Sequence, residues 1–507
     1  MARSIDCMGV VGTGVMGSGI AQIAAQAGLS VILFDARDGA AALAKDNLAA
    51  TFAKLADKGK ISTDAAQAAL SRLTVAGRLD DLAQCDLVVE AIVERIEAKQ
   101  ELLGKLEGIV AADCILATNT SSLSVTAIAS ASDHPERVAG FHFFNPVPLM
   151  KVVEVIDGLA GDPAVGDALL ALAARMGHRG VRTKDTPGFI VNHAGRAYGT
   201  EALKILNECV APVGEIDTIL RETCGFRMGP LELFDLTGLD VSHPVMESIY
   251  NQFYQEPRYR PSALTRLMLA GGRIGRKAGE GFYRYRAGQK IDPPSPRPVP
   301  DVVKLPPVWI GAEQDEDRNT LVALMKKLGA QVEAGATPTN DALCLLAPYG
   351  YDTTMACELA GTPPQRTVCI DMFAGIARHR TLMTCPATDA AYRDAAHALL
   401  ARDGVGVTLI RDSVGFVAQR TLAAIVNLAC DIAQQGIASV DDIDDAVRLG
   451  LGYPQGPLAW GDALGPAKLA LILSRMLEVT GDPRYRPSPW LRRRAALGLS
   501  LRQPENA

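Results

Sequence analysis

Short apolar runs alternate with helical patterns over the first part of the chain. The strand candidates are residues 5–11, 29–34, 87–92 and 114–118, and the helix candidates are 15–27 and 95–106. Strands that alternate with helices in this way favour an α/β fold with a parallel, doubly wound sheet. We therefore predict an N-terminal α/β domain over residues 1–184.

A strand–turn–strand pattern lies near the end of that domain. Apolar runs over 138–144 and 149–156 are joined through Asn145-Pro-Val-Pro148. If the two strands pair antiparallel, His142 and Glu154 oppose each other, because they lie six residues on either side of Pro148.

The helical pattern that begins near Gly188, through 189–210 and 216–223, is repeated later in the chain. Displaced by 227 residues, Gly188-Phe189 recurs as Gly415-Phe416, Ile216-Asp217 as Ile443-Asp444, Gly229-Pro230-Leu231 as Gly456-Pro457-Leu458, Asp235 as Asp462, and Gly238 as Gly465. The hexapeptide Pro-Arg-Tyr-Arg-Pro-Ser begins at Pro257 and again at Pro483. Matches in one register indicate a duplication. We predict two copies of an all-α domain, over 185–286 and 411–501.

The segment between the copies divides into a linker and a second α/β region. Seven prolines within 292–307 predict a linker over 287–307. Strand-like runs at 308–310, 343–346 and 367–370 follow without a glycine-rich loop, so we predict a degenerate α/β remnant over 308–410 and a tail over 502–507. A loose alignment puts Met372 at the position of His142, Met383 at that of Glu154 and Gln419 at that of Asn192. We therefore expect one active site per chain.

Composition narrows the class of protein. The net charge of −6 gives no general attraction to nucleic acid or to an anionic membrane, so a polyanionic substrate would need a local basic patch. No apolar run reaches the roughly 18–20 residues of a membrane helix, and no signal-peptide pattern opens the chain. Ten scattered cysteines show no metal-ligand spacing. We expect a cytoplasmic protein without a metal site.

A glycine-rich loop follows the first predicted strand and opens a helix. Gly12, Gly14 and Gly17 form a Gly-x-Gly-x-x-Gly motif, in which glycines allow a tight turn and close approach to a pyrophosphate. A structural turn is the alternative. Asp35 ends the next strand, where a carboxylate binds a ribose and repels a 2′-phosphate. The loop therefore predicts NAD in preference to NADP, a preference that Arg37 could soften.

Alcohol oxidation would give His142 and Glu154 a chemical role. A histidine can accept the hydroxyl proton near neutral pH, and a carboxylate on its other ring nitrogen orients it. Ser121 follows a strand at the carboxyl edge of the sheet, where such sheets bind ligands. The alternatives are a core histidine for His142, a helix cap for Ser121 and a surface residue for Asn192.

Six motifs together resemble the 3-hydroxyacyl-CoA dehydrogenase family. They are Val11-Gly-Thr-Gly-Val-Met-Gly17, Val89-Glu-Ala-Ile-Val-Glu94, Asn119-Thr-Ser-Ser122, His142-Phe-Phe-Asn-Pro146, Asp185-Thr-Pro-Gly-Phe-Ile-Val-Asn192 and Gly279-Glu-Gly-Phe-Tyr283. The resemblance covers residues 5–285 and returns over roughly 411–490. It implies a Rossmann NAD-binding domain followed by a helical domain, and oxidation of an (S)-3-hydroxyacyl-CoA.

The resemblance also implies roles for individual residues. His142 is the general base with Glu154 as its partner, and Ser121 and Asn192 contact the reacting end of the substrate. The residues that match cofactor contacts are Asn145, Glu94, Lys99 and Lys277. Lys54 matches a contact to the CoA phosphates, with Lys58 and Lys60 nearby, although these lysines could equally form a solvated helix face. Asn47 stands where the family can carry a CoA-contacting serine, which puts that contact in doubt.

The length and the duplication resemble long family members that oxidise 3-hydroxyadipyl-CoA in bacterial phenylacetate breakdown. One alternative is a short-chain dehydrogenase that acts on 3-hydroxybutyryl-CoA. An alternative of another class is an NAD-binding scaffold whose second half recruits other enzymes. The helical copies could form an intrachain pseudo-dimer or contribute to a homodimer.

Overall fold

The computed structural model describes residues 4–291 and 297–505, and the chain forms two compact units. The first unit contains residues 1–193 and 435–452, and the second contains 194–434 and 453–507. Within the described residues, no helix is long and apolar enough to cross a membrane, and none of the ten cysteines forms a disulfide. The predicted linker prolines at 293, 294 and 296 lie outside the described residues.

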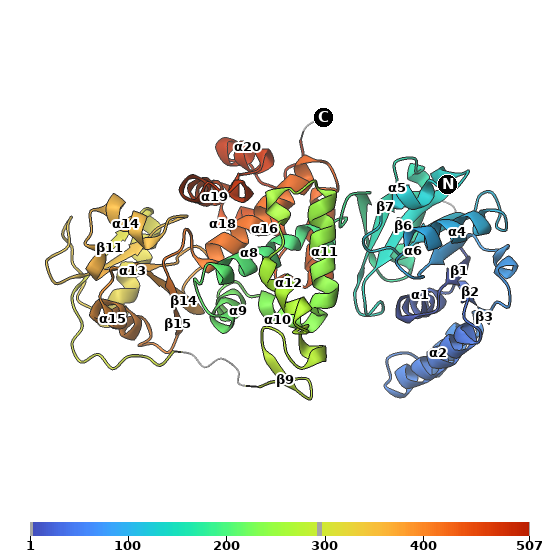
Figure 1. Cartoon of the computed structure of the whole chain (residues 1–507), viewed down its shortest axis with the longest axis horizontal. Coiled ribbons are helices and arrows are strands. Elements are labelled where there is room, and N and C mark those ends of the chain that lie inside the picture. The colour runs from blue at the N-terminus through green and yellow to red at the C-terminus, as the bar shows by residue number, and fades with distance from the viewer. Residues whose placement is uncertain (1–3, 292–296, 506–507) are drawn as a thin grey trace. The chain divides into compact units, whose positions relative to one another are not determined.

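The first unit is built on an eight-stranded sheet with the order β3-β2-β1-β4-β5-β6-β7-β8 (Figure 1). Its strands are β1 (Cys7–Val11), β2 (Ser30–Phe34), β3 (Leu73–Val75), β4 (Leu87–Glu90), β5 (Ile115–Thr118), β6 (Val138–Phe143), β7 (Val152–Asp157) and β8 (Arg179–Lys184). Neighbouring strands are parallel except for β6 and β7. The predicted doubly wound sheet is therefore confirmed, and β7 starts three residues later than the apolar run suggested.

Helices cover both faces of this sheet. They are α1 (Val15–Gln26), α2 (Ala40–Asp57), α3 (Thr63–Ser71), α4 (Ile96–Glu107), α5 (Val125–Ala129), α6 (Pro163–Arg175) and α7 (Val191–Ala194). Alternate strand residues face opposite sides, so Val89 joins the core beneath α1 and α6, whereas Val88 joins the core beneath α4 and α5. A sheet that is buried on both faces needs strands made of consecutive apolar residues, and the central strands here begin with such runs.

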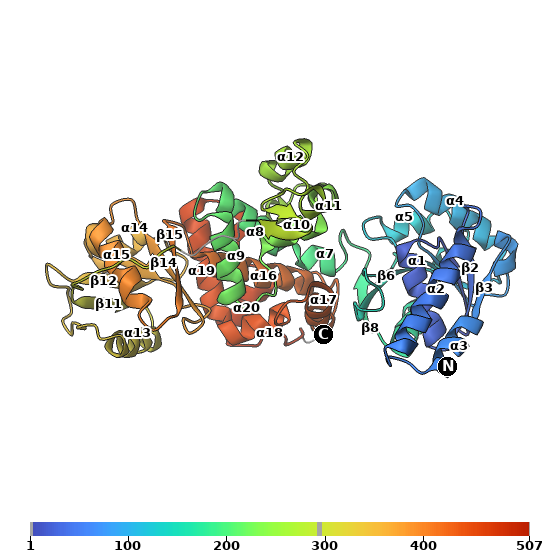
Figure 2. The same ribbon diagram turned by 90° about the horizontal axis from the view of Figure 1, so that it is seen from below.

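The second unit contains most of both helical copies (Figure 2). The first copy continues with α8 (Arg196–Asn207), α9 (Val213–Glu222), α10 (Pro230–Thr237), α11 (Leu239–Gln252) and α12 (Ala263–Ala270). It ends in a hairpin of β9 (Arg284–Arg286) and β10 (Gln289–Ile291), which extends past the boundary predicted at residue 286. The second copy contributes α16 (Val417–Gln434), α18 (Pro457–Leu464), α19 (Pro466–Thr480) and α20 (Pro489–Leu497). The remaining helix, α17 (Val440–Leu451), belongs to the first unit.

A second, smaller sheet lies in the same unit and has the order β11-β12-β13-β14-β15. Its strands are β11 (Val308–Ala312), β12 (Leu343–Ala347), β13 (Thr367–Ile370), β14 (His379–Thr384) and β15 (Gly406–Arg411), and its helices are α13 (Asp315–Lys327), α14 (Thr353–Ala360) and α15 (Ala390–Leu400). Only β13 and β14 are antiparallel. Strand order and direction match β4 to β8, so this sheet repeats the second half of the first one.

The strand register corrects the alignment predicted for the remnant. The 227-residue displacement puts Thr381, and not Met383, at the position of Glu154, because Thr381 pairs with Thr408 as Glu154 pairs with Val181. The residue opposite Thr381 is Asp371, whose N–H donates to the Thr381 carbonyl. Asp371, and not Met372, therefore occupies the place of His142. The prediction was wrong because the β13–β14 connection is two residues shorter than the β6–β7 connection.

The two helical copies exchange one helix with each other's sheets. In the first unit α17, from the second copy, packs on β7 and β8, and the Lys184 N–H donates to the Ile437 carbonyl at 2.9 Å. In the second unit α9, from the first copy, packs on β14, and the Arg411 N–H donates to the Val210 carbonyl at 2.9 Å. Both pairs of residues are related by the same displacement. The chain therefore contains two equivalent, reciprocal contacts.

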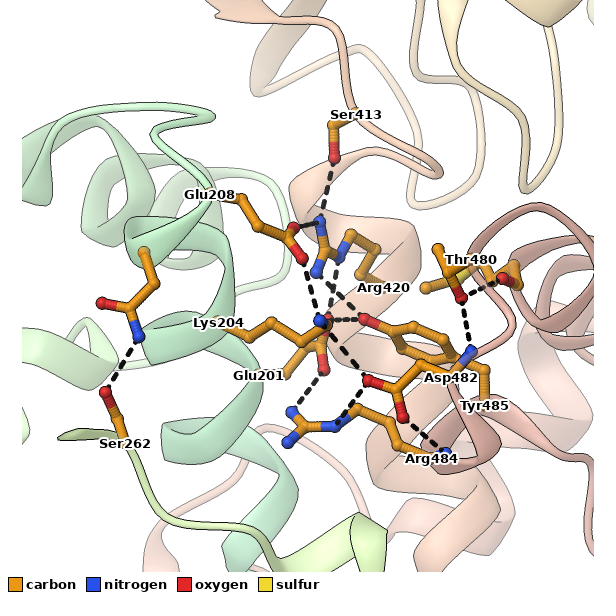
Figure 3. A network of polar contacts seen from close by, with 12 residues as sticks. Glu201, Lys204, Glu208, Ser262, Ser413, Arg420, Thr480, Asp482, Arg484 and Tyr485 are labelled. Atoms are coloured by element: carbon orange, nitrogen blue, oxygen red, sulfur yellow. Dashed lines mark hydrogen bonds and ion pairs between the residues drawn. The ribbon is translucent and has the colours of Figure 1, made fainter. Parts of the chain in front are cut away.

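Buried charges join the two copies within the second unit (Figure 3). Glu201 on α8 accepts hydrogen bonds from Arg420 on α16 at 2.8 Å and from the Tyr485 hydroxyl at 2.8 Å, and it pairs with Arg484 at 3.3 Å. Glu201 and Arg420 are almost completely buried. Glu208 pairs with Arg420 as well. Because a buried charge without a partner is costly, these pairs specify how α8 and α16 meet.

Replacing Glu201 by Gln should destabilise the protein strongly. The change removes the buried carboxylate that Arg420 and Arg484 share and leaves them only Glu208 and Asp482, at a cost of about 3 kcal/mol. We expect a lower midpoint in chemical denaturation, followed by tryptophan fluorescence. Glu101→Gln is the control. Glu101 and Lys105 form a solvent-exposed ion pair, and loss of this pair should change the midpoint little. Equal midpoints for the two variants would contradict the prediction.

Candidate active site

The glycine-rich loop has the local geometry that a dinucleotide needs. Gly12 has a φ of 90°, and a Cβ there would lie 2.7 Å from the Ala91 carbonyl oxygen. A Cβ at Gly17 would lie 1.8 Å from the Gly12 carbonyl oxygen, so β1 and α1 approach closely only because both residues are glycine. Nothing lies within 4 Å of the corresponding point at Gly14, which begins α1 without a side-chain cap. The helix N-terminus is therefore open to a pyrophosphate, and the loop fits NAD.

Asp35 stands at the end of β2, as the sequence predicted. Its carboxylate accepts hydrogen bonds from the Thr13 N–H and hydroxyl and a bidentate pair from Arg37. The Arg37 guanidinium holds the pKa of the Asp35 carboxyl well below its usual range. Because Asp35 is ionised at neutral pH and bonded to the loop, it is placed to bind a ribose and to repel a 2′-phosphate.

A cleft of about 530 Å³ adjoins this loop. It is lined by Thr13 and Gly14 of the loop, by Arg37, by Asn47 on α2, and by Asn145, which precedes a cis proline. The predicted nicotinamide neighbour Asn145 and the doubtful CoA contact Asn47 thus share one cleft. Lys54, Lys58 and Lys60 are exposed at the C-terminal end of α2, which makes that end basic. Their contact with CoA stays a prediction.

Glu94 ties the loop after β4 to the loop after β5. Its Oε1 accepts hydrogen bonds from the Thr120 hydroxyl at 2.7 Å and from the Ser121 N–H at 2.8 Å. Burial alone would raise the pKa of Glu94, but Thr120 and the Lys99 ammonium lower it overall. Lys99 is itself buried and pairs with Glu90 at 2.8 Å and with Glu94 at 3.3 Å, so it fixes the position of the Glu94 side chain.

His142 and Glu154 meet across the antiparallel β6–β7 pair, as predicted. They are directly paired residues in the ladder, and His142 Nδ1 lies 2.7 Å from Glu154 Oε2. Glu154 is completely buried and His142 nearly so. The rings of Phe144 and Phe189 lie 4.5 and 5.8 Å from the imidazole, centroid to centroid, and provide an apolar wall.

The other hydrogen bonds of Glu154 define the role of each histidine nitrogen. Glu154 Oε1 accepts from the N–H groups of Ile190 and Val191, at 2.9 and 2.8 Å. A carboxylate oxygen accepts hydrogen bonds, so Nδ1 is the nitrogen that donates to Glu154. In the neutral ring Nε2 then carries the lone pair and can accept a proton.

Two supports of this pair were missed by sequence reasoning. The N–H groups of Ile190 and Val191 reach Glu154 because Gly188 and Phe189 both have positive φ, 78° and 50°. Asn119, next to the predicted Ser121, accepts a hydrogen bond from the Phe143 N–H at 2.8 Å and so joins the loop after β5 to β6. The available signal for the first support was Gly188, just before a predicted helix, and for the second it was the motif residue Asn119.

The remaining predicted residues fall in two places. Ser121 is exposed beside Glu94, and Asn192 is half-buried in α7, directly after the Val191 that holds Glu154. Lys277 belongs to the second unit, where it bonds Asp240 at 2.6 Å. The roles of all three stay predictions. Among the described residues, no group of acidic, histidine or cysteine side chains could hold a metal ion.

Family comparisons agree with this geometry. Residues 7–186 match the NAD-binding domain of 3-hydroxyacyl-CoA dehydrogenase, and residues 188–285 and 415–505 each match its C-terminal domain. The chain belongs to the 3-hydroxyacyl-CoA dehydrogenase family. It is an NAD-dependent 3-hydroxyacyl-CoA dehydrogenase with two copies of the C-terminal domain, and the predictions of fold class, enzyme class and cofactor are confirmed.

Named relatives differ in length and in the acyl group of their substrate. The 3-hydroxyadipyl-CoA dehydrogenase of Escherichia coli K12 is 38% identical over 98% of this chain and 99% of its own length. A probable 3-hydroxybutyryl-CoA dehydrogenase of Deinococcus radiodurans is 42% identical, over 55% of this chain and 99% of its own. A crystal structure described as 3-hydroxybutyryl-CoA dehydrogenase from Escherichia coli K12 has a TM-score of 0.84 and 36% identity, over 98% of this chain and 99% of that one.

The second half of the dehydrogenase has a closed polar cluster at the corresponding place. Gln419, the counterpart of Asn192, bonds Asp371 at 3.0 Å and the backbone of Pro348 and Gly350. Burial raises the pKa of Asp371 to about 6. Neither an imidazole nor a carboxylate partner stands here, because Asp371 and Thr381 replace His142 and Glu154.

Replacing Asp35 by Ser should move the coenzyme preference toward NADP. The substitution removes the charge that repels a 2′-phosphate and releases the Arg37 guanidinium to bind one. We expect the ratio of kcat/KM for NAD to that for NADP to fall about tenfold or more, at saturating 3-hydroxyacyl-CoA. Arg37→Gln is the control and should keep the preference for NAD. An unchanged ratio in the Asp35 variant would show that another group selects the coenzyme.

Proposed function

We propose that this dehydrogenase oxidises (S)-3-hydroxyadipyl-CoA to 3-oxoadipyl-CoA, as in phenylacetate breakdown, in the cytoplasm. The observation that carries this choice is the match over 98% of the chain, second half included, to a relative named for that substrate. The relatives named for 3-hydroxybutyryl-CoA in the same comparison match little more than half of the chain.

In the proposed reaction His142 is the general base. Its Nε2 takes the proton of the substrate's 3-hydroxyl while the C3–H bond breaks and the C3–O double bond forms. Bound NAD supplies the acceptor for the hydride that leaves C3. Glu154 stabilises the imidazolium formed at His142, and its two backbone donors hold the carboxylate in place while it does so. The apolar wall of Phe144 and Phe189 limits the access of water to the ring.

Ser121 and Asn192 are proposed to contact the reacting oxygen and the thioester end of the substrate. The proposed role of Ser121 is supported by its exposed position on the loop after β5, where its N–H donates to Glu94. Asn192 is supported by its place one residue after Val191, because the same turn fixes both Glu154 and the start of α7. Lys54 at the basic end of α2 is proposed for the CoA phosphates, and Glu94, Asn145 and Lys277 for the cofactor.

A short-chain 3-hydroxybutyryl-CoA dehydrogenase is the second candidate. The observation that favours it is the full-length solved structure that carries this description. The two candidates share the same chemistry at C3 and differ only in whether the far end of the acyl chain bears a carboxylate.

We also infer that the second half acts as an internal partner for the first. The reciprocal bonds from Lys184 to Ile437 and from Arg411 to Val210 are what a dimer axis would generate between two subunits. The buried pairs of Glu201 with Arg420 and Arg484 belong to the same arrangement. An intrachain pseudo-dimer is therefore the proposed state, in place of a recruitment module.

Replacing His142 by Gln tests the proposed base. Glutamine keeps a hydrogen-bonding group near Glu154 but cannot accept a proton at neutral pH, so kcat should fall by about 10²–10⁴-fold. Stopped-flow NADH absorbance gives kcat, and fluorescence titration should show NAD binding unchanged. Turnover equal to that of the wild type, with NAD bound, would exclude His142 as the base.

The acyl preference is tested with two substrates in parallel. We expect kcat/KM for (S)-3-hydroxyadipyl-CoA to exceed that for (S)-3-hydroxybutyryl-CoA at least tenfold, about 1.4 kcal/mol of transition-state discrimination. NADH formation from NAD is measured for both esters at the same pH. The reverse preference would select the short-chain candidate.

A further inference from the structure

One helix from the second half of the sequence, α17, lies within the first unit and packs beside the residues that hold the His142–Glu154 pair. Gly450 of α17 packs against Val191, so closely that a Cβ at Gly450 would lie 3.0 Å from one Val191 methyl and 3.1 Å from the other. Val191 is the residue whose N–H donates to Glu154 at 2.8 Å. The same point on α17 faces Val152 of β7, the strand that carries Glu154.

Charged residues fix α17 in this position. Arg179, the first residue of β8, bonds Asp445 at 2.9 Å and Asp442 at 2.7 Å, both on α17. Arg179 pairs with Val152 in the sheet, so the ion pairs act on the end of the strand ladder next to Gly450. Burial opposes the charge on Arg179, but the two carboxylates raise its pKa overall.

These contacts are not repeated where α9 meets the second sheet. The 227-residue displacement puts Gly406 at the position of Arg179, and Glu215 and Thr218 at those of Asp442 and Asp445. Thr223 stands at the position of Gly450. The backbone contact is symmetric, but within the described part of the chain the ion pairs and the close glycine packing occur only on the side that carries His142.

We propose that α17 is a positioning element for catalysis, in which Gly450 holds Val191 and thereby the backbone donors of Glu154. The second half, which has lost its own base, then sets the geometry of the base in the first. The inference rests on the proposed role of His142 and Glu154. Because no residue of α17 lines the cleft beside the glycine-rich loop, α17 should affect kcat without affecting the binding of NAD.

The test is a set of substitutions at Gly450. Gly450→Ala gains helix propensity, which offsets part of the cost of moving Val191 by a few tenths of an ångström, so its melting temperature should stay close to that of the wild type. Gly450→Val crowds Val191 further and should lower kcat about tenfold, since small displacements of a catalytic group are costly. The dissociation constant of NAD should stay within about twofold, because the glycine-rich loop lies apart from Val191.

A compensating change separates positioning from simple destabilisation. Val191→Ala removes both methyl groups that a side chain at 450 would meet, while it keeps the backbone N–H that holds Glu154. In the double variant kcat should return to within about threefold of the Val191→Ala value, which is a coupling between the two sites. Thr223→Val, at the counterpart of Gly450, is the matched control and should leave kcat unchanged.

The outcomes distinguish this inference from the proposed function. Full activity of Gly450→Val, with His142→Gln inactive, would overturn the role of α17 and leave the base assignment intact. A loss of kcat that Val191→Ala does not restore, with a lower melting temperature and weaker NAD binding, would overturn it as well. Full activity of His142→Gln would instead contradict the proposed base.

Discussion

A carboxylate without any access to solvent has to find all its hydrogen bonds inside the protein, and Glu154 is such a group. It obtains them from two segments that are separate in the sequence: the imidazole of His142 in β6 and the N–H groups of Ile190 and Val191 before and in α7. The antiparallel register of β6 and β7 and the turn before α7 are both needed to satisfy it. The geometry of the site is thus a consequence of satisfying the hydrogen bonds of one buried carboxylate.

The duplication shows which parts of that arrangement depend on the charge. In the second half Asp371 and Thr381 stand at the paired positions, and Gln419 bonds the carboxyl and the neighbouring backbone directly. The second half nevertheless keeps the sheet, the helix α9 that packs on it, and the reciprocal backbone contact. The fold tolerates the loss of the imidazole and its partner because a neutral amide satisfies the same buried space.

The sequence predicted those parts of the fold and of the site that depend on local patterns of residues. The glycine spacing located the loop, and the equal distance of His142 and Glu154 from Pro148 predicted that they face each other. Contacts made by backbone groups, such as the Val191 N–H, have no side-chain signature and were missed. The predicted register of the remnant was wrong because its hairpin is two residues shorter, so the strands before and after that hairpin are displaced by different numbers of residues. Which helical copy covers which sheet could not be read at all, since both copies carry the same pattern.

The exchange of α17 has a consequence for how the protein is made. The ribosome completes β8 long before it synthesises α17. Until then the Arg179 side chain and the turn at Val191 lack the helix that packs against them. Contacts between segments so distant in sequence form late and slowly. The nascent first half therefore carries its cofactor loop from the beginning, whereas the full support of its base arrives only with the last part of the polypeptide.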